Sequence, residues 1–123
     1  MISADSHVTE NPETYRKYID PSLRDRAPHL ASDGAGGDVF IIPDLTQGAL
    51  PMGLIAAAGT KSEDIRMTGR FTDWHRGGWD PEARLADQDR DGVVAEVLYP
   101  TVGLVLCRHQ DLDYKKACMD AYN

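Results

Sequence analysis

Two residues close to the start of the chain, Asp5 and His7, have side chains that bind divalent metals, and Glu10 follows them closely. The residues before them, 2–4, form a short and largely apolar run that predicts a β-strand. Side chains two positions apart in an extended segment point to the same side. Asp5 and His7 would therefore project together from the end of this strand, where a carboxylate oxygen and an imidazole nitrogen suit a metal such as zinc.

A plainer interpretation of this segment stays open. A strand that runs into a turn would use Asp5 or Ser6 to accept hydrogen bonds from backbone N–H groups. Two ligands also fall short of a complete site, because a catalytic zinc usually takes at least three from the protein. Glu10 fits two roles: a partner that fixes the tautomer of His7, or an exposed acid ahead of a helix.

Residues 60–78 form a polar, irregular stretch that is rich in side chains of the kind that bind ligands. His75 and Trp74 are the candidates for substrate binding here, with His75 contacting the substrate and the Trp74 indole stacking against it. The alternative is that these loop side chains pack against their own insertion. His109 is expected in a surface loop. The sequence points to no catalytic residue.

Length and composition indicate one ordinary domain, with 123 residues of which 41% are hydrophobic and 27% charged. The formal net charge of -7 and the lack of a basic cluster argue against nucleic acid and against an anionic membrane surface as partners. No apolar run is long enough to span a bilayer, and the start of the chain has no basic region of a secretory signal. We therefore expect a cytoplasmic protein, with Cys107 and Cys118 reduced and buried as small hydrophobic groups.

The first half of the chain predicts short elements. The start signal Asn11-Pro12-Glu13 predicts a helix with Tyr15, Tyr18 and Ile19 on one face. Asp20-Pro21 repeats this signal and predicts a second short helix.

The next segments alternate between loop, strand and helix signals. Residues 32–37 have the composition of a loop. Residues 38–42 are the clearest β run, and residues 45–51 would return as its partner strand in a small hairpin. Residues 53–58 predict a short helix, with Gly59 as its left-handed C-terminal residue.

The strongest structural signals lie in the last third of the chain. Asp80-Pro81-Glu82 opens a helix that Gly92 ends. Residues 93–99 are nearly all apolar, which is typical of a parallel strand covered on both faces. Glu96 interrupts this run, and a charge there needs a partner. Residues 113–123 begin another helix.

The elements follow one another in the order strand, long insertion, helix, strand and helix. A crossover helix between two parallel strands is the repeating unit of α/β proteins. This order is the beginning of an α/β barrel or of a doubly wound fold. Because a complete (β/α)8 barrel takes about 250 residues, we expect the chain to be the N-terminal part of a longer protein.

Several motifs then stand in a fixed order along the chain: Ile2-Ser3-Ala4-Asp5-Ser6-His7-Val8-Thr9-Glu10, Trp79-Asp80-Pro81-Glu82-Ala83-Arg84-Leu85, Asp89-Arg90-Asp91-Gly92-Val93 and Glu96-Val97-Leu98-Tyr99-Pro100. Together they resemble the amidohydrolase-2 family, the metal-dependent hydrolases and decarboxylases related to aminocarboxymuconate semialdehyde decarboxylase. The resemblance covers nearly the whole chain. It implies the N-terminal part of a TIM (β/α)8 barrel of the amidohydrolase superfamily, with a small hairpin-containing insertion after the first strand.

The resemblance also implies a divalent metal, usually zinc, bound where the first strand ends. The two ligand positions match Asp5 and His7, so a carboxylate stands where the family typically has a histidine. The remaining metal ligands and the usual general base would lie beyond Asn123. This chain would therefore hold half of a metal site.

The resemblance implies hydrolysis or non-oxidative decarboxylation of a small carboxylated or cyclic substrate. One partial domain would contain the first barrel strand and metal motif in residues 1–10 and the insertion in residues 11–79. Residues 80–123 would add the helix, the second barrel strand and the start of the next helix. The alternative is a catalytically inactive partial barrel that forms a homo-oligomer or binds a missing half.

Overall fold

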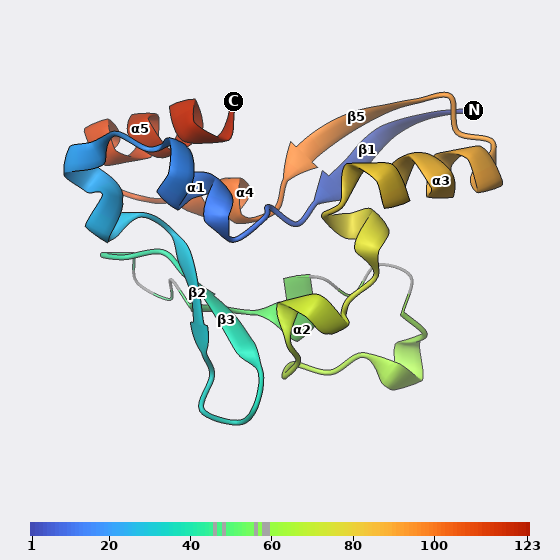
Figure 1. Cartoon of the computed structure of the whole chain (residues 1–123), viewed down its shortest axis with the longest axis horizontal. Coiled ribbons are helices and arrows are strands. Elements are labelled where there is room, and N and C mark those ends of the chain that lie inside the picture. The colour runs from blue at the N-terminus through green and yellow to red at the C-terminus, as the bar shows by residue number, and fades with distance from the viewer. Residues whose placement is uncertain (46, 48, 56, 58–59) are drawn as a thin grey trace.

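Two separate sheets organise the computed structural model, which describes residues 1–45, 47, 49–55, 57 and 60–123 (Figure 1). A parallel pair joins β1 (Ile2–Val8) to β5 (Ala95–Pro100). An antiparallel sheet has the order β2, β3, β4, with the bounds His29–Ser32, Asp38–Ile41 and Ala49–Pro51. The fold is therefore mixed α/β, and the parallel pairing that the sequence predicts for its first and last strands is confirmed.

Helix α3 (Pro81–Asp91) precedes β5 and begins and ends where the sequence predicts. The Ala83 amide donates a hydrogen bond of 2.9 Å to the Asp80 carboxylate, which satisfies one free N–H group of the first turn. Gly92 ends the helix in the left-handed conformation, with a φ of 68°, which glycine adopts without strain. Together with the insertion, α3 forms the crossover that two parallel strands require.

One extra residue in β1 changes the register of the parallel pair. Ser3 lies opposite Glu96 and Ser6 lies opposite Leu98, so three steps along β1 match two steps along β5. This irregularity is a β-bulge, which leaves one residue of the bulged strand unpaired. Because paired residues project to the same side of a sheet, Ser6 shares a face with Leu98 and Glu96.

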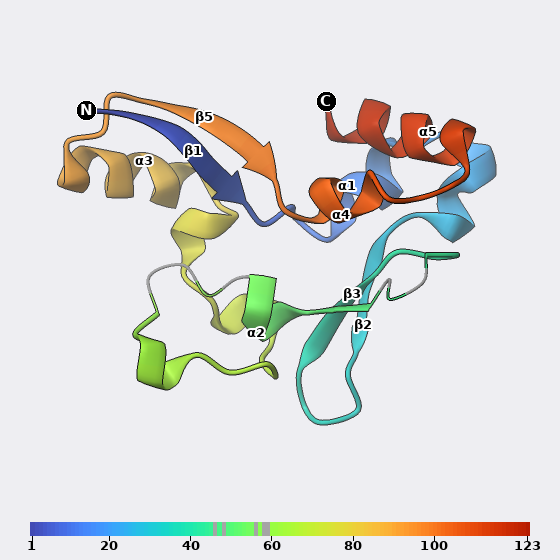
Figure 2. The same ribbon diagram turned by 180° about the vertical axis from the view of Figure 1, so that it is seen from behind.

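The opposite face of the pair carries His7, which lies opposite Tyr99, and Val97. Helix α3 lies along one side of the two strands, as both views show (Figures 1 and 2). Val97 is 47% exposed and Tyr99 is 44% exposed. The prediction that residues 93–99 are covered on both faces is therefore wrong for the described part of the chain. One crossover helix covers only part of one face of a two-stranded sheet, and Leu98 on the side of α3 is itself 46% exposed.

The main hydrophobic core lies where a cluster of helices meets the antiparallel sheet. The cluster contains α1 (Glu13–Tyr18), the 3-10 helix η1 (Pro21–Arg26), α4 (Val102–Leu106) and α5 (Leu112–Tyr122). Tyr15 and Phe40 are fully buried in it, with their rings in a T-shaped contact at 6.3 Å between centroids. The predicted C-terminal helix is confirmed, and its residues Tyr114, Cys118 and Ala121 are buried.

Helix α1 begins as the sequence predicts, since the Glu13 amide donates a hydrogen bond of 3.0 Å to the Asn11 side chain. The prediction that Tyr15, Tyr18 and Ile19 share one face is wrong for Tyr18, which is 62% exposed while Tyr15 and Ile19 are buried. The helix ends at Tyr18, and Ile19 continues in an extended conformation. This change of direction turns Ile19 into the core and leaves Tyr18 in solvent.

The antiparallel sheet contains one strand, β2, that the sequence did not predict. It pairs with β3, so the predicted loop forms the turn of a hairpin. The Asp33 carboxylate closes this turn by accepting hydrogen bonds from the amides of Ala35 and Gly37, at 2.7 and 2.8 Å. The predicted hairpin of residues 38–42 with 45–51 is confirmed in shorter form by the pairing of β3 with β4.

The rest of the insertion consists of short helical turns. Their bounds are α2 (Met52–Ile55), η2 (Ser62–Asp64), η3 (Phe71–Asp73) and η4 (Arg76–Gly78). The helix predicted over residues 53–58 is confirmed as far as Ile55, Ala57 is not helical, and Ala56, Ala58 and Gly59 lie outside the described residues. No helix in the described part of the chain is both long and apolar enough to cross a bilayer.

Candidate metal site at the end of the first strand

The structure places Asp5 and His7 side by side at the C-terminal end of β1. The Asp5 Oδ1 atom and the His7 Nε2 atom are 3.7 Å apart, and the two side chains are 83% and 46% exposed. They project together, as the spacing of two predicts for a strand. The alternative, in which Asp5 or Ser6 closes a turn, does not hold, because β1 continues to Val8.

The donor atoms of this pair fit one metal ion. Zinc binds imidazole nitrogen and carboxylate oxygen at distances that sum to about 4.2 Å. The separation of 3.7 Å between Asp5 Oδ1 and His7 Nε2 is shorter than this sum, so both atoms can contact a single ion. Among the described residues, no group of three or more His, Cys, Asp or Glu side chains could hold a metal. Asp5 and His7 thus amount to two ligands of a site that needs more.

Tyr99 is the aromatic neighbour of this pair. Its ring centroid lies 5.9 Å from that of His7, with the ring planes tilted by 37°. The two residues are opposite each other in the parallel register, so Tyr99 projects from β5 on the same face as His7. The uncovered face of the parallel pair therefore combines two metal-binding side chains with an exposed phenol.

Glu10 takes neither of the two roles that the sequence left open. It is 3% exposed, and its carboxylate accepts hydrogen bonds from the amides of Val102 and Gly103 at 2.9 and 2.7 Å. The Tyr15 hydroxyl donates to the same carboxylate at 3.0 Å, and burial together with the Glu10 charge raises the pKa of Tyr15. Glu10 is thus a buried acid that joins the end of β1 to the start of α4.

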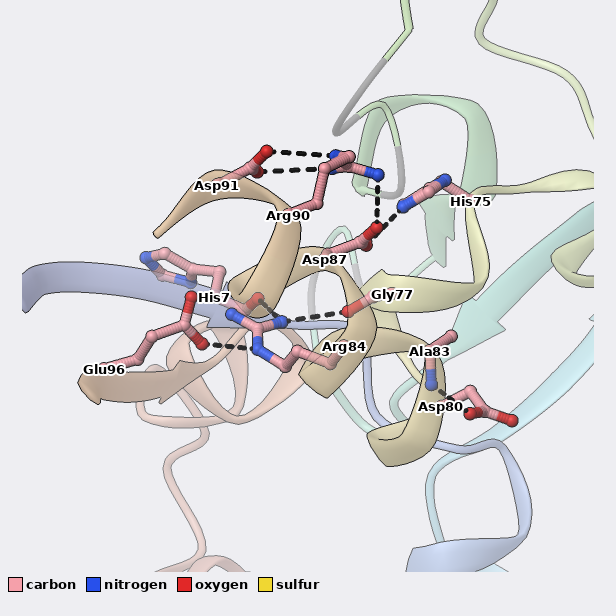
Figure 3. A network of polar contacts seen from close by, with 10 residues as sticks. All are labelled: His7, His75, Gly77, Asp80, Ala83, Arg84, Asp87, Arg90, Asp91 and Glu96. Carbon is pink, nitrogen blue, oxygen red and sulfur yellow. Dashed lines mark hydrogen bonds and ion pairs between the residues drawn. The ribbon is translucent and has the colours of Figure 1, made fainter. Parts of the chain in front are cut away.

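Arg84 and Glu96 form a largely buried ion pair on the other face of the strands (Figure 3). The Arg84 Nε atom donates to Glu96 at 2.6 Å, and the side chains are 16% and 13% exposed. Burial alone would raise the pKa of Glu96, but hydrogen bonds from Arg84, Gln88 and Ser6 outweigh it and hold that pKa below its usual value. The prediction that Glu96 needs a partner is confirmed. This requirement is also the sequence signal that could have led to Arg84.

His75 lies in the connection between η3 and η4 and is paired with helix α3. Its Nε2 atom is 2.5 Å from the Asp87 carboxylate, which also accepts a hydrogen bond of 2.8 Å from Arg90 (Figure 3). The hydrogen bond to His75, with the charges of His75 and Arg90, holds the pKa of Asp87 below its usual range. Gly77 permits this approach, because a Cβ atom there would collide with the Asp87 carboxylate.

A cavity of about 350 Å³ brings two of the predicted site residues together. Its lining comes from β1, η4, α3 and β5 and includes His7, His75, Arg84, Asp87 and Glu96. Trp74 does not line this cavity. Its indole lies against Gly69 and packs on the hydrophobic core, and its Nε1 atom is buried without a hydrogen-bond partner. The structure therefore places His75, but not Trp74, in a cavity shared with His7.

Two expectations about other reactive side chains are corrected. His109 lies in the loop between α4 and α5 as expected, but its side chain is turned inward and is only 4% exposed: its Nε2–H group donates to the Pro43 carbonyl, and Nδ1 accepts from the Asp111 amide. Both ring nitrogens thus have backbone partners, which makes its burial favourable. Cys118 is buried as expected, and burial raises its pKa to about 11, but Cys107 is exposed just past the end of α4.

Comparisons with known proteins show what this fold is similar to. No family model and no curated protein sequence matches the chain. The fold is similar to that of a solved amidohydrolase from Mycobacterium avium subsp. paratuberculosis K-10, with a TM-score of 0.62 and 19% sequence identity. The similarity covers 99% of this chain and 36% of the solved one, so this chain spans little more than a third of that protein's length. The chain therefore has a fold related to part of an amidohydrolase.

Proposed function

We propose that this chain supplies two ligands, Asp5 and His7, to the divalent metal centre of a hydrolytic enzyme of the amidohydrolase class. The observation that supports this best is the pair of donor atoms 3.7 Å apart at the carboxyl end of a parallel strand. Active sites of parallel α/β barrels lie at this end of the strands. The fold similarity to part of an amidohydrolase also supports the proposal.

The proposed ligands suit zinc, and the fold suits the N-terminal part of a (β/α)8 barrel. A zinc ion bound here would lower the pKa of a water molecule and polarise a substrate carbonyl. The Asp5 carboxylate would lower the net charge of the centre, while the neutral His7 imidazole would supply a nitrogen donor. Further ligands would come from outside these 123 residues, since two do not complete a catalytic site.

The substrate would be a small carboxylated or cyclic molecule, processed by hydrolysis or by non-oxidative decarboxylation. We propose His75 as a contact for this substrate, and the support is that His75 lines a cavity together with His7. In that cavity the His75 ring is paired with Asp87 of helix α3. The role of Trp74 as a substrate contact stays a prediction. Its indole is directed to Gly69 and the core, so the cavity gives this role no support.

The test is a manganese titration of the 15N-labelled chain followed by NMR. A paramagnetic ion broadens the amide signals nearest to it, so even weak binding through two ligands can be located. We expect the signals of Asp5, His7 and Tyr99 to broaden first, and added zinc to restore them by competition. The substitutions Asp5→Asn and His7→Ala should each abolish this local effect.

Asp89→Asn is the matched control, because Asp89 is an exposed acid of α3 outside the proposed site. It should leave the broadening at His7 unchanged. Broadening centred on the acids of α3, or broadening at His7 that persists in both site variants, would disprove the proposal.

A second function is favoured by a different observation. Val97 and Tyr99 are nearly half exposed on the uncovered face of the strands. An inactive partial barrel would bury this apolar surface against a second copy or a complementary chain. The titration separates the two proposals, because an inactive partial barrel needs no metal at Asp5 and His7.

A further inference from the structure

The side chain of Arg84 contacts the backbone of the proposed metal ligand His7. Its Nη1 atom donates hydrogen bonds to the His7 carbonyl at 3.0 Å and to the Gly77 carbonyl at 3.1 Å. Its Nε atom donates to Glu96 on the neighbouring strand. One guanidinium thus connects β1, β5 and η4 at the level of the ligand (Figure 3).

The contact with Arg84 restricts the backbone at His7. The carbonyl that accepts from Arg84 belongs to the peptide that follows His7. Holding this carbonyl in place restricts the ψ dihedral of His7. Glu96, the ionic partner of Arg84, shares its face of the sheet with Ser6, the residue that precedes His7. The backbone dihedrals of His7 set the direction of its Cα–Cβ bond and therefore the position of its imidazole.

Stability alone is a weak explanation for this arrangement. Arg84 and Glu96 are both more than four-fifths buried, and the cost of removing two charges from water offsets much of their attraction. The guanidinium is, however, a planar group with several donors at fixed angles. It can hold a carboxylate and two carbonyls in one geometry, which an apolar pair in the same space could not do.

We infer that Arg84, held in place by Glu96, is a positioning residue for His7: it fixes the backbone so that the imidazole stays directed to Asp5. Arg84 reaches His7 through its backbone carbonyl and not through its imidazole, so it acts on the ligand without being one. This inference rests on the proposed function of Asp5 and His7. Groups that orient a metal-bound histidine typically contribute a factor of about 10 to 100 in metal affinity.

The experiment compares two substitutions at Arg84 with one at Arg90. Arg90 lies on the same helix, and its ion pairs are with Asp87 and Asp91, so Arg90→Gln removes a charge without touching β1. Arg84→Gln removes the charge and the shared donors. Arg84→Lys keeps the charge beside Glu96 but offers a single ammonium group in place of the fork.

Two readouts are measured on each variant. The first is the dissociation constant of manganese at the Asp5 and His7 signals. The second, taken without metal, is the set of three-bond couplings of His7, which report whether its side chain occupies one rotamer. We expect Arg84→Gln to weaken manganese binding by about 10- to 100-fold and to average the His7 couplings. Arg84→Lys should lie in between, and Arg90→Gln should match the wild type.

The signals of Phe40 and Tyr114 in the distant core show whether each variant is folded. If Arg84→Gln does not fold, Arg84→Lys is used to test the inference. Its ammonium group can still pair with Glu96, so this variant is expected to stay folded. Unchanged affinity and a single His7 rotamer in the folded Arg84 variants would overturn the inference and leave the proposed function intact. A wild-type chain that binds no manganese at His7 would instead overturn the proposed function, and with it a positioning role toward a metal.

Discussion

Glu10 and Gly103 are 93 positions apart, yet the Gly103 amide donates a hydrogen bond of 2.7 Å to the Glu10 carboxylate. The same carboxylate accepts from the Val102 amide and from the Tyr15 hydroxyl. It thereby ties the residues that follow β1 to helix α4 and to helix α1. The segment that leaves His7 is consequently anchored in the core within three residues.

Replacing this acid should destabilise the fold strongly. Glu10→Gln would remove the charged acceptor of three backbone N–H groups and turn amide hydrogens toward them. We expect the free energy of unfolding to fall by about 3 kcal/mol or more, measured by urea denaturation. The control Glu13→Gln changes an exposed acid and should alter it by less than about 0.5 kcal/mol. Similar small changes in both variants would contradict the role assigned to Glu10.

The contact between His75 and Asp87 should make stability depend on pH in the acid range. Because the folded chain lowers the pKa of Asp87, this carboxylate favours the folded state above its unfolded pKa of about 3.9. The contribution is lost as the pH falls through the lower, folded value. Wild type should therefore exceed Asp87→Asn in free energy of unfolding at pH 5, and the difference should shrink as the pH falls below about 4.

Denaturation curves at a series of pH values measure this difference. Asp89→Asn, on the same helix, is the control and should follow the wild-type profile. A constant difference between wild type and Asp87→Asn across the acid range would show that the carboxylate charge is not the source of the stabilisation.

The uncovered face of β1 and β5 should make the chain associate with itself. Val97 lies on this face and is 47% exposed. We expect light scattering to detect oligomers of the wild type, and Val97→Asp to raise the dissociation constant by about tenfold or more, since burying a valine stabilises by about 1.5–3 kcal/mol. Leu112→Asp alters an equally apolar side chain that is 68% exposed on α5 and should leave the association unchanged.

The 123-residue chain alone should show no appreciable hydrolase activity. It offers Asp5 and His7, whereas a catalytic zinc usually takes at least three protein ligands. Assays of the purified chain with zinc or manganese and small esters, amides and carboxylated ring compounds would test this. Turnover that disappears in Asp5→Ala would show that the chain assembles a working site by itself, for example between copies.

The helices and strands that could be predicted from the sequence are those whose ends are set by residues close by in the chain. Asp80, Pro81 and Gly92 fix helix α3 through a cap, a fixed φ and a left-handed turn, and each effect acts within a few positions. The side-by-side placement of Asp5 and His7 followed in the same way from the period of an extended strand.

Features that depend on distant partners were beyond such signals. Glu10 looked like a metal-site or surface acid, because the α4 amides that bury it lie more than 90 positions away in the sequence. His109 looked exposed for the same reason, since the Pro43 carbonyl that satisfies its ring is distant along the chain. Residues 93–99 are apolar enough for a strand covered on both faces. The sequence of a strand does not show, however, whether the covering side chains come from the same chain or from another one.

The bulge in β1 makes the direction of the His7 side chain depend on the number of residues in the strand. Ile2 and His7 are five positions apart and still share a face, which a strict two-residue alternation would forbid. The single added residue between Ser3 and Ser6 reverses which face the following side chains of β1 point to. Deleting one residue there would turn the His7 imidazole toward α3 without changing any side chain of the motif. A change in the number of residues in this strand would thus be more damaging than most changes in their identity.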